Sequence, residues 1–483
     1  MRVAFKVQYE LGATPIEKIE FPLNSRDELP PVLRALQYIY ATPDLNKKVF
    51  NLLEKKIMSG IKATGRLGMS LWEILVFAAI RLALDADYDR LQHIANYDNL
   101  VRSLVGIANF GENLKKYPLR TLKDNVSLLD KKTIEKIDKL IGNSAHRLLN
   151  IDKLNVKIDT YVLETNVHFP TDFNLLWDAS RKSIELVGQI YKSLQVAGWR
   201  KYKDWRNKMK RAYHKAAKSC RGVGKHTDQG LKAAVAYLSL AEQLSHKLND
   251  SIELLQVMLI LPDFNFMKLN NLIYFKDHID KHIDLVRRRI IFQETIPHDE
   301  KIFSLFEPYT EWIKKGKTRH QVELGLRIAV ATDQYGFILG YRVMHQQQDV
   351  DIAVPFAKAL LSQYAIASIS FDKGFWSPKN YDQLVGLVDK LIMPKKGKLN
   401  KLEQQREQDK TFRALRHQHA AVESAINCLE HHGLNRCPDK GLDGFRRYTA
   451  LGVLAYNLHK LGNILLAQDK KQLSKSPAYS KAA

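Results

Sequence analysis

Three acidic side chains stand in apolar segments of this chain, and their placement restricts the folds that it can adopt. Asp159 ends the apolar run of KLNVKIDTYVLETNV and Asp372 ends that of ISFDKGF, so both are expected at the exposed ends of buried strands. Glu423 lies in HAAVESAINCLEHHGLNRC, whose apolar residues repeat at helical spacing. Two strand-borne aspartates and a helix-borne glutamate can converge on a pair of divalent cations suited to phosphodiester chemistry. Each acid alone is more often a solvated or capping residue, so the interpretation depends on the sequence around all three.

That surrounding sequence forms five ordered blocks that cover most of the chain. The first, Ile158–Asp178, has the Asp followed by a Thr, an Asn and a Pro-Thr-Asp. The middle block, Lys315–Met344, has a basic loop, an ELG and a hairpin pattern. The others are KGFWSPKN and MPKKGK after the second acid, HxxVESxIN around the third, and the segment Gly433–Gly462. Together the blocks resemble the DDE transposases of bacterial insertion sequences.

The resemblance implies an α/β ribonuclease-H-like catalytic core, a mixed five-stranded sheet with helices. Asp159, Asp372 and Glu423 carry over as the catalytic residues, which would also bind two Mg²⁺ ions, with Mn²⁺ able to substitute. One ion, between Asp159 and Asp372, would activate water to nick the transposon end. The other, between Asp159 and Glu423, would stabilise the leaving oxygen, and the freed 3′ hydroxyl would attack target DNA. This pairing of acids with ions comes from the family.

The partners implied by the resemblance are double-stranded DNA, at the element ends and the target, and a second copy of the chain in a synaptic homodimer. Two alternatives stay open. The chain could be a nuclease that never joins strands, or a domesticated DNA-binding protein that retains only the fold. The presence of all three acids argues against the second. A chromosome-packaging protein would need neither the acids nor their ordered blocks.

The composition suits a protein that handles nucleic acid. The chain has 75 Lys and Arg against 52 Asp and Glu, a formal net charge of +23, as expected of nucleic-acid-binding proteins. Basicity alone would also suit a ribosome-associated or membrane-surface protein. The 3 cysteines form no CxxC pair, so neither a disulfide framework nor a zinc site is expected. No stretch resembles a signal peptide or approaches the roughly 20 apolar residues of a membrane helix. We therefore expect a location in the bacterial cytoplasm, at the nucleoid.

The patterns divide the chain into six predicted segments. Residues 1–107 are expected to be mostly helical, with a strand at Val3–Tyr9 and a buried helix that starts with a capping box of Ser70 and Glu73. This domain could recognise transposon ends or form a structural or dimerising bundle, and the resemblance favours end recognition. The other segments are a helical connector at 108–150, the first strand block of the core at 151–180, a helical basic insertion at 181–300, the remaining core at 301–465 and a disordered basic tail at 466–483.

The densest basic run, Trp199–Lys225, lies in the insertion and has eleven Lys or Arg and a single Asp. On a helix its apolar residues form one stripe, for which core packing is favoured over base stacking; they are Tyr202, Trp205, Met209, Tyr213 and Ala216. A solvated helix usually mixes both signs of charge, so these basic faces indicate a neighbouring polyanion. We expect contacts to the DNA backbone from Arg200, Lys201, Lys203, Lys208, Lys210, Arg211, Lys215 and Lys218.

The remaining core is predicted to contain strands at Lys301–Glu307, Val322–Thr332, Phe337–Met344 and Ile366–Phe371, and one within KLIMPKKGK. Asp333 is assigned to a hairpin turn and a structural role. Trp376 could stack on an unpaired base, and His417 and His419 could assist proton movement, but packing is favoured for all three. Further DNA contacts are expected from Lys315, Lys317, Lys373, Lys395, Lys396, Lys398, Arg436, Arg446 and Arg447.

Overall fold

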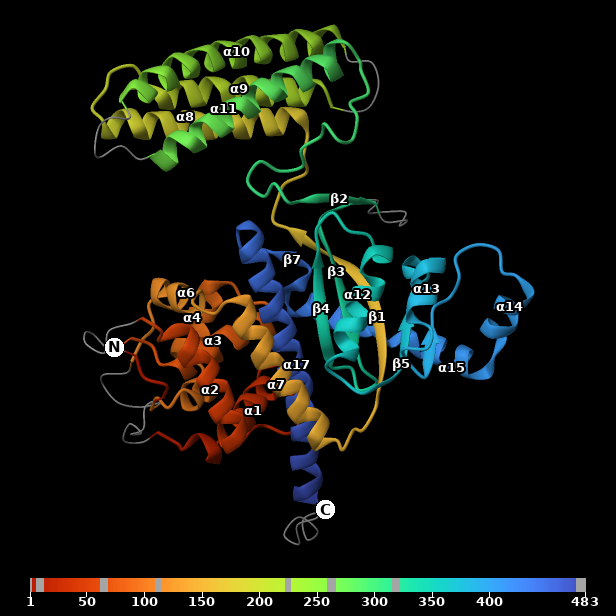
Figure 1. The fold of residues 1–483 in the computed structure, drawn as a ribbon. Coiled ribbons are helices and arrows are strands. Elements are labelled where there is room, and N and C mark those ends of the chain that lie inside the picture. The colour runs from red at the N-terminus through yellow and green to blue at the C-terminus, as the bar shows by residue number, and fades with distance from the viewer. Residues whose placement is uncertain are drawn as a thin grey trace. The chain divides into compact units, whose positions relative to one another are not determined.

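The computed structural model describes residues 2–5, 13–60, 68–108, 115–221, 227–258, 266–314 and 322–474. The chain is a mixed α/β protein whose contacts divide it into two compact units (Figure 1). One unit is Met1–Asn166 with Ile313–Ala483, and the other is Val167–Trp312. Among the described residues, no helix has the length and apolar character that a membrane span requires.

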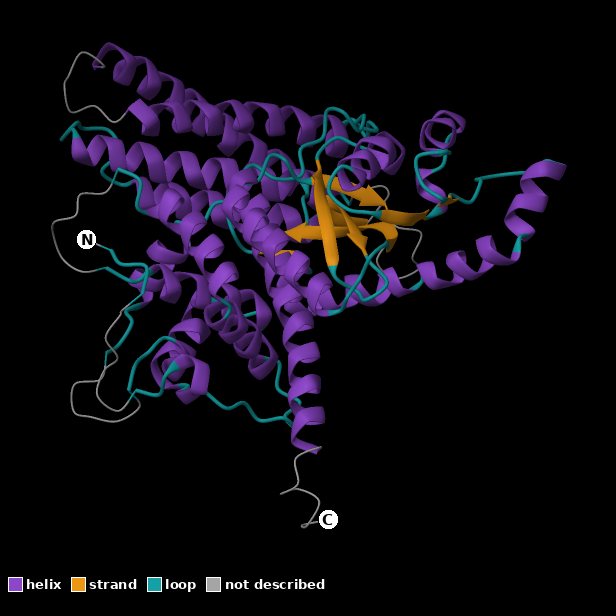
Figure 2. Cartoon of the chain, turned by 60° about the horizontal axis from the view of Figure 1, so that its bottom comes forward, coloured by secondary structure: helices purple, strands orange, loops and turns teal. Residues whose placement is uncertain are grey.

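A seven-stranded mixed sheet forms the centre of the first unit, and Figure 2 shows the strands gathered in it. Neighbouring strands run in the order β4-β3-β1-β5-β6, with β2 beside β3 and β7 beside β1. The pairs β4–β3 and β3–β1 are antiparallel, whereas β1–β5 and β5–β6 are parallel. The strands are β1 (Leu154–Thr165), β2 (Glu311–Lys314), β3 (Val322–Thr332), β4 (Ile338–Met344), β5 (Ile366–Phe371), β6 (Lys390–Ile392) and β7 (Arg436–Cys437).

Several strand predictions are confirmed, and two are wrong. The structure has β3 and β5 at the predicted bounds, and β4 begins at Ile338 instead of Phe337. The predicted total of five strands is wrong, because β2 and β7 span only 4 and 2 residues, too few for a readable alternation. The predicted strand at Lys301–Glu307 is also wrong. There the hydroxyl of Ser304 accepts hydrogen bonds from the N–H groups of Phe306 and Glu307, which favours a turn. The predicted strand Val3–Tyr9 lies largely outside the described residues.

One sheet face is covered by α12, which runs beside the strands in Figure 1. Ile158 of β1, Phe371 of β5 and Phe356 of α12 belong to the same buried core. Because side chains alternate along a strand, Asp159 points to the opposite face. On that face α16 packs on β1 and β3. The helices of this part are α12 (Asp349–Leu361), η4 (Lys373–Phe375), α13 (Pro378–Leu384), α14 (Lys401–Gln408), α15 (Lys410–His419), α16 (Ala421–Leu429) and η5 (Glu430–Leu434).

The chain before β1 is helical, and every residue of α3 is buried. The capping box is confirmed. The Ser70 hydroxyl accepts a hydrogen bond from the backbone N–H of Glu73, and the Glu73 carboxylate accepts one from the backbone N–H of Ser70. Packing of α1, α3 and α7 on α17 joins this region to the rest of the unit. The elements are η1 (Ile16–Lys18), α1 (Leu29–Ala41), α2 (Pro43–Ile57), α3 (Leu71–Ala83), α4 (Tyr88–Tyr97), α5 (Asn99–Leu104), α6 (Leu119–Val126) and α7 (Lys131–Leu148).

The final helix, α17 (Gly441–Ser474), extends further than the sequence indicated. The predicted disordered tail begins at residue 466, and this is wrong for residues 466–474, which are helical. The reason is tertiary: Asp469 accepts two hydrogen bonds from Arg34, at 2.7 and 3.1 Å, and Lys470 donates to Asn24 at 2.9 Å. These contacts with residues far away in the sequence hold the last turns. The rest of the predicted tail lies outside the described residues.

The second unit is a bundle of long helices with its own buried core (Figure 1). The predicted packing stripe is confirmed: Met209 and Ala216 are buried, and Tyr202, Trp205 and Tyr213 pack against the same core. Close packing is possible because α8 has Gly188, where an added Cβ would lie 2.5 Å from the Tyr202 ring. The elements are α8 (Asp172–Ser193), α9 (Tyr202–Ser219), α10 (Asp228–Val257), α11 (Phe266–Val286) and η3 (Arg287–Ile291).

Candidate active site

The register between β1 and β5 brings the two predicted aspartates together. Ile158 is the parallel partner of Phe371, the last residue of β5. Asp159 and Asp372 each follow one member of that pair, so they occupy equivalent positions on neighbouring strands. The predicted position at an exposed strand end is confirmed for Asp372, which lies just beyond the end of β5. It is wrong for Asp159, which is half-buried in the middle of β1, because that strand continues to Thr165. The strand register thus places side by side two residues that are more than 200 positions apart in the sequence.

Glu423 belongs to a helix that packs on the strand of Asp159. It lies in the first turn of α16, whose buried side chains Val422, Ala425 and Ile426 hold the helix on the sheet. The Glu423 side chain is exposed. The helical segment predicted around Glu423 is confirmed, and this glutamate lies outside the buried face of the helix.

The charges of these acids interact. Burial raises the pKa of Asp159 to about 6, opposed by a hydrogen bond of 2.7 Å from the N–H of Thr160. The negative charges of Asp372, Asp349 and Glu423 raise this pKa further. Like charges disfavour ionisation only when they are close. The three predicted acids and one additional acid, Asp349, therefore share one electrostatic environment.

Asp349 is a site residue that the sequence analysis missed. It is the first residue of α12, and its carboxylate accepts a hydrogen bond of 3.1 Å from the Thr160 hydroxyl. Burial raises the pKa of Asp349, and the charge of Asp372 adds to this effect, while Thr160 and Arg327 lower it. Its other carboxylate oxygen lies 3.0 Å from where a Cβ on Gly374 would stand. In sequence Asp349 looks like an ordinary acid in a first helical turn, and only its position after the central hairpin could have suggested more.

Of the two predicted histidines, one belongs to the site. His419 Nδ1 and the Ser370 hydroxyl are 2.9 Å apart, and Ser370 stands two residues before Asp372. Burial lowers the pKa of His419, although the charge of Asp372 opposes this. His417 is exposed. His419 thus fastens the end of α15 to β5, in agreement with the packing role favoured from the sequence.

The donor chemistry of these acids suits magnesium, since carboxylate oxygens are its preferred protein ligands. Nevertheless, among the described residues no group of three or more His, Cys, Asp or Glu side chains is arranged to hold a metal ion. The residue types and their electrostatic coupling suit a divalent cation, but the described side chains are not gathered into a coordination shell.

The basic residues predicted around the second acid and in the central block have different surroundings. Lys373 is exposed directly after Asp372, and Lys396 and Lys398 are exposed as well. Lys395 instead pairs with Glu403 at 2.8 Å and lies over the Trp376 ring, which packs against the core as the sequence favoured. The segment with Lys315 and Lys317 lies outside the described residues.

Three predicted arginines have acidic partners. Arg436 pairs with Glu164 at 3.2 Å, and Arg446 lies 3.8 Å from Asp443. Arg447 binds Asp439 at 2.8 Å. Asp439 also accepts from a buried arginine of α3, so Arg447 has a structural contact that its basic surroundings in sequence did not reveal.

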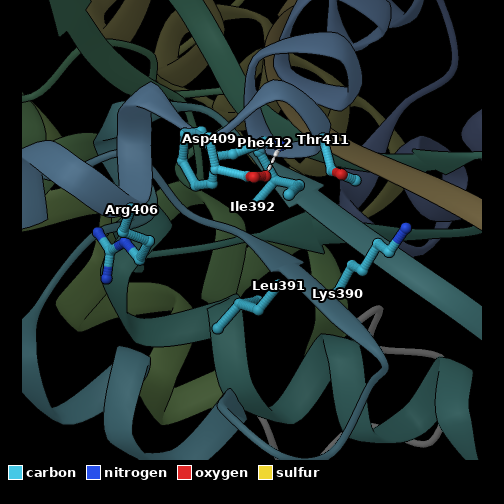
Figure 3. A pocket seen from close by; sticks show the side chains of 7 residues that line it. All are labelled: Lys390, Leu391, Ile392, Arg406, Asp409, Thr411 and Phe412. Atoms are coloured by element: carbon cyan, nitrogen blue, oxygen red, sulfur yellow. Dashed lines mark hydrogen bonds between the residues drawn. The ribbon is translucent and has the colours of Figure 1, made fainter.

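A separate pocket of ≈ 280 Å³ lies between β6 and the start of α15 (Figure 3). Arg406 stands at its wall with the guanidinium 4.4 Å from the centroid of the Tyr381 ring. None of the four site acids lines it; its walls are Lys390, Leu391, Ile392, Arg406, Asp409, Thr411 and Phe412.

Comparisons with protein-family models, with curated proteins and with solved structures found no match. The functional argument therefore depends on the geometry of the chain itself.

Proposed function

We propose that this chain is a DNA transposase that cleaves insertion-sequence ends and joins them to target DNA in a metal-dependent reaction. The observation that carries the proposal is the parallel pairing of Ile158 with Phe371, which sets Asp159 and Asp372 side by side. Electrostatic coupling of Asp159 to Asp372, Asp349 and Glu423, and of Asp349 to Asp372, supports it. The resemblance of the five sequence blocks supplies the reaction.

A ribonuclease-H-like core is part of this proposal. The element order β1, β3, β4, α12, β5 agrees with it, as does the sheet order β4-β3-β1-β5-β6. Both strands that bear the aspartates are central, so the acids are supported by paired neighbours on each side. A site on a rigid sheet holds its side chains more closely than one on loops.

In the proposed site Asp159, Asp372 and Glu423 would hold two magnesium ions, which supply activation of an attacking oxygen and stabilisation of a leaving oxygen. The N–H of Thr160 fixes the Asp159 carboxylate through its 2.7 Å hydrogen bond. Lys373, exposed beside Asp372, is positioned to contact a DNA phosphate. The N-terminal domain would recognise the element ends, and two copies would act together because two ends must be joined.

The test is cleavage and joining of labelled duplexes that carry the DNA flanking the gene, with magnesium or calcium. The wild type is compared with Asp159→Asn, Asp372→Asn and Glu423→Gln, and with Asp382→Asn, an exposed aspartate of α13, as the matched control. We expect nicked and joined products with magnesium for the wild type and the control. Each site variant should lose at least about 10³-fold in rate, since charge stabilisation by the site would be removed, while still binding DNA.

The outcomes separate the alternatives. Cleavage without joined product would identify a nuclease. DNA binding without any metal-dependent product, when the true ends are used, would indicate a domesticated DNA-binding protein and would refute the transposase proposal.

A further inference from the structure

Helix α9 and the turn before it carry eight predicted DNA-binding cations, and all of them are exposed. Lys201, Lys208 and Lys215 recur every seven residues, so they lie in one row along the helix. Arg211 and Lys218 form the adjacent row by the same spacing. The core-facing side chains of α9 lie on the other side of the helix. Five cations are therefore gathered on one face, whereas Lys203 and Lys210 fall on a different row.

These cations lack acidic partners, unlike three arginines near the end of the same unit. Arg288 pairs with Glu300 at 2.6 Å and Arg289 with Asp172 at 2.6 Å, and Arg287 pairs with Glu242. In the described part of the chain, none of the eight cations of α9 forms an ion pair. Several arginines of the bundle are thus neutralised by acids, whereas this face stays positive. Such a face repels itself unless an anion lies against it.

The same face is hollowed by a pocket of ≈ 420 Å³. Three cations line it, with one acid, an amide and the edge of an indole; the residues are Lys201, Asp204, Trp205, Asn207, Lys208 and Arg211. Amide and cationic donors that converge on one recess suit a phosphate group. An anionic ligand in this pocket would also lie near the Asp204 carboxylate. The attraction from the three cations must therefore exceed the repulsion from that one anion.

A membrane surface does not fit this face. A helix that lies on lipid buries an apolar face in the bilayer, but the apolar side chains of α9 are used in the core of the bundle. None of the exposed large apolar residues belongs to α9. What remains outside is polar and positive, as a nucleic-acid backbone requires.

We propose that the α9 face formed by Lys201, Lys208, Arg211, Lys215 and Lys218 binds the sugar-phosphate backbone of duplex DNA, with one phosphate in the pocket. The cations from residue 201 to residue 218 span about 25 Å along α9 and its N-cap, which matches roughly seven base-pair steps of 3.4 Å. This inference rests on the proposed function for the choice of DNA. The bundle contributes affinity and leaves sequence recognition to other parts of the chain.

The test measures binding of a 30-base-pair duplex to the full chain by fluorescence anisotropy at several salt concentrations, without magnesium. The variant Lys201→Gln with Lys208→Gln removes two charges from the pocket. Its matched control, Lys192→Gln with Lys232→Gln, removes two exposed lysines of α8 and α10 in the same unit. Circular dichroism melting of each protein verifies that the bundle is folded.

We expect the pocket variant to bind DNA at least about 10-fold more weakly at low salt. The slope of the logarithm of its association constant against the logarithm of salt concentration should be smaller in magnitude by about 2, one for each lost phosphate contact. The control should keep the wild-type slope. Equal effects of the two variants would overturn the proposal, because net charge alone would then explain binding. Tighter binding of duplex RNA than of DNA, lost in the pocket variant, would overturn the choice of ligand.

Failure of this inference and failure of the proposed function are distinguishable. The binding assay contains no magnesium and reads no cleavage. A chain that never cleaves DNA but shows the expected change in slope would retain the α9 site and lose the catalytic proposal. If the chain cleaves DNA but the pocket variant has the wild-type slope, the catalytic proposal is retained and the α9 site is refuted.

Discussion

The Thr160 hydroxyl donates a hydrogen bond of 3.1 Å to the Asp349 carboxylate, which ties β1 to the first turn of α12. The backbone N–H of the same threonine donates to Asp159 at 2.7 Å. Thr160 therefore orients two acids of the site, Asp159 through its backbone and Asp349 of α12 through its side chain. Loss of either contact should loosen the arrangement of the carboxylates.

We accordingly predict that Asp349→Asn and Thr160→Val each lower the rate of metal-dependent DNA cleavage by about 10- to 100-fold, the usual effect of losing a residue that orients metal ligands. Thr160→Ser keeps the hydroxyl and should restore most of the rate. DNA affinity should not change, because neither residue lies on the α9 face. Rates measured over a magnesium titration would show the reduction as a weaker apparent metal affinity. A reduced rate in Thr160→Ser equal to that in Thr160→Val would contradict this role.

A second prediction concerns Asp138 of α7, which accepts a hydrogen bond of 2.9 Å from Asn457. Burial raises the pKa of Asp138 to about 7, and the negative charge of Glu135 adds to the rise, while Asn457 opposes it. The charge of Asp138 in turn contributes to the raised pKa values of Tyr341 and Tyr364. Between about pH 4 and pH 7 the folded chain thus holds a proton that the unfolded chain has released. The free energy of unfolding should therefore fall as pH rises through this window.

Asp138→Asn keeps an acceptor for Asn457 and cannot titrate. Relative to the wild type, its free energy of unfolding should increase by about 1–3 kcal/mol between pH 5 and pH 8. Urea unfolding at the two pH values measures this difference. Asp124→Asn, at an exposed position of α6, is the control and should show no such change. Equal pH dependence in the wild type and Asp138→Asn would show that Asp138 ionises normally.

A third prediction concerns the buried ion pair of Arg81 and Asp439, whose atoms Nη2 and Oδ1 are 2.9 Å apart. The Arg81 side chain is 4 % exposed and its guanidinium lies 4.3 Å from the centroid of the Tyr88 ring. Asp439→Ala would leave a buried cation without its carboxylate, at a cost of about 3–5 kcal/mol. Thermal unfolding of the variant should show this loss, and Asp443→Ala, at an exposed position nearby, should cost less than about 0.5 kcal/mol. A similar small cost for Asp439→Ala would show that water replaces the carboxylate.

A fourth prediction compares two helical glycines. An added Cβ on Gly462 of α17 would lie 1.7 Å from the carbonyl oxygen of Pro31, whereas one on Gly142 of α7 would have no atom within 4 Å. Gly462→Ala must push α17 away from α1 and should lower the free energy of unfolding by more than about 2 kcal/mol. Gly142→Ala should raise it by about 0.5–1 kcal/mol, because alanine favours the helix. Denaturant unfolding of both variants measures these changes, and the same sign for both would contradict the described packing of α17 on α1.

Local patterns predicted much of the fold correctly. The bounds of β3 and β5 and the capping box at Ser70 follow from alternation and from residue types within a few positions. The packing stripe of α9 follows from helical periodicity in the same way. The wrong strand at Lys301–Glu307 has a local cause, the turn at Ser304. The other errors occurred where residues distant in the sequence decide the structure. The bond from Arg34 holds the last turns of α17, and β7 exists because Arg436 and Cys437 meet the end of β1.

For the candidate site, the sequence by itself predicted Asp159, Asp372 and Glu423 as candidates, through the resemblance of the surrounding blocks and through strand and helix periodicity, which are local properties. Only the tertiary structure decided that Ile158 pairs with Phe371, and so that two of these acids are neighbours. It also added Asp349, and it showed which basic residues already have acidic partners. Strand register and ion pairing depend on residues brought together by folding, which no local pattern records.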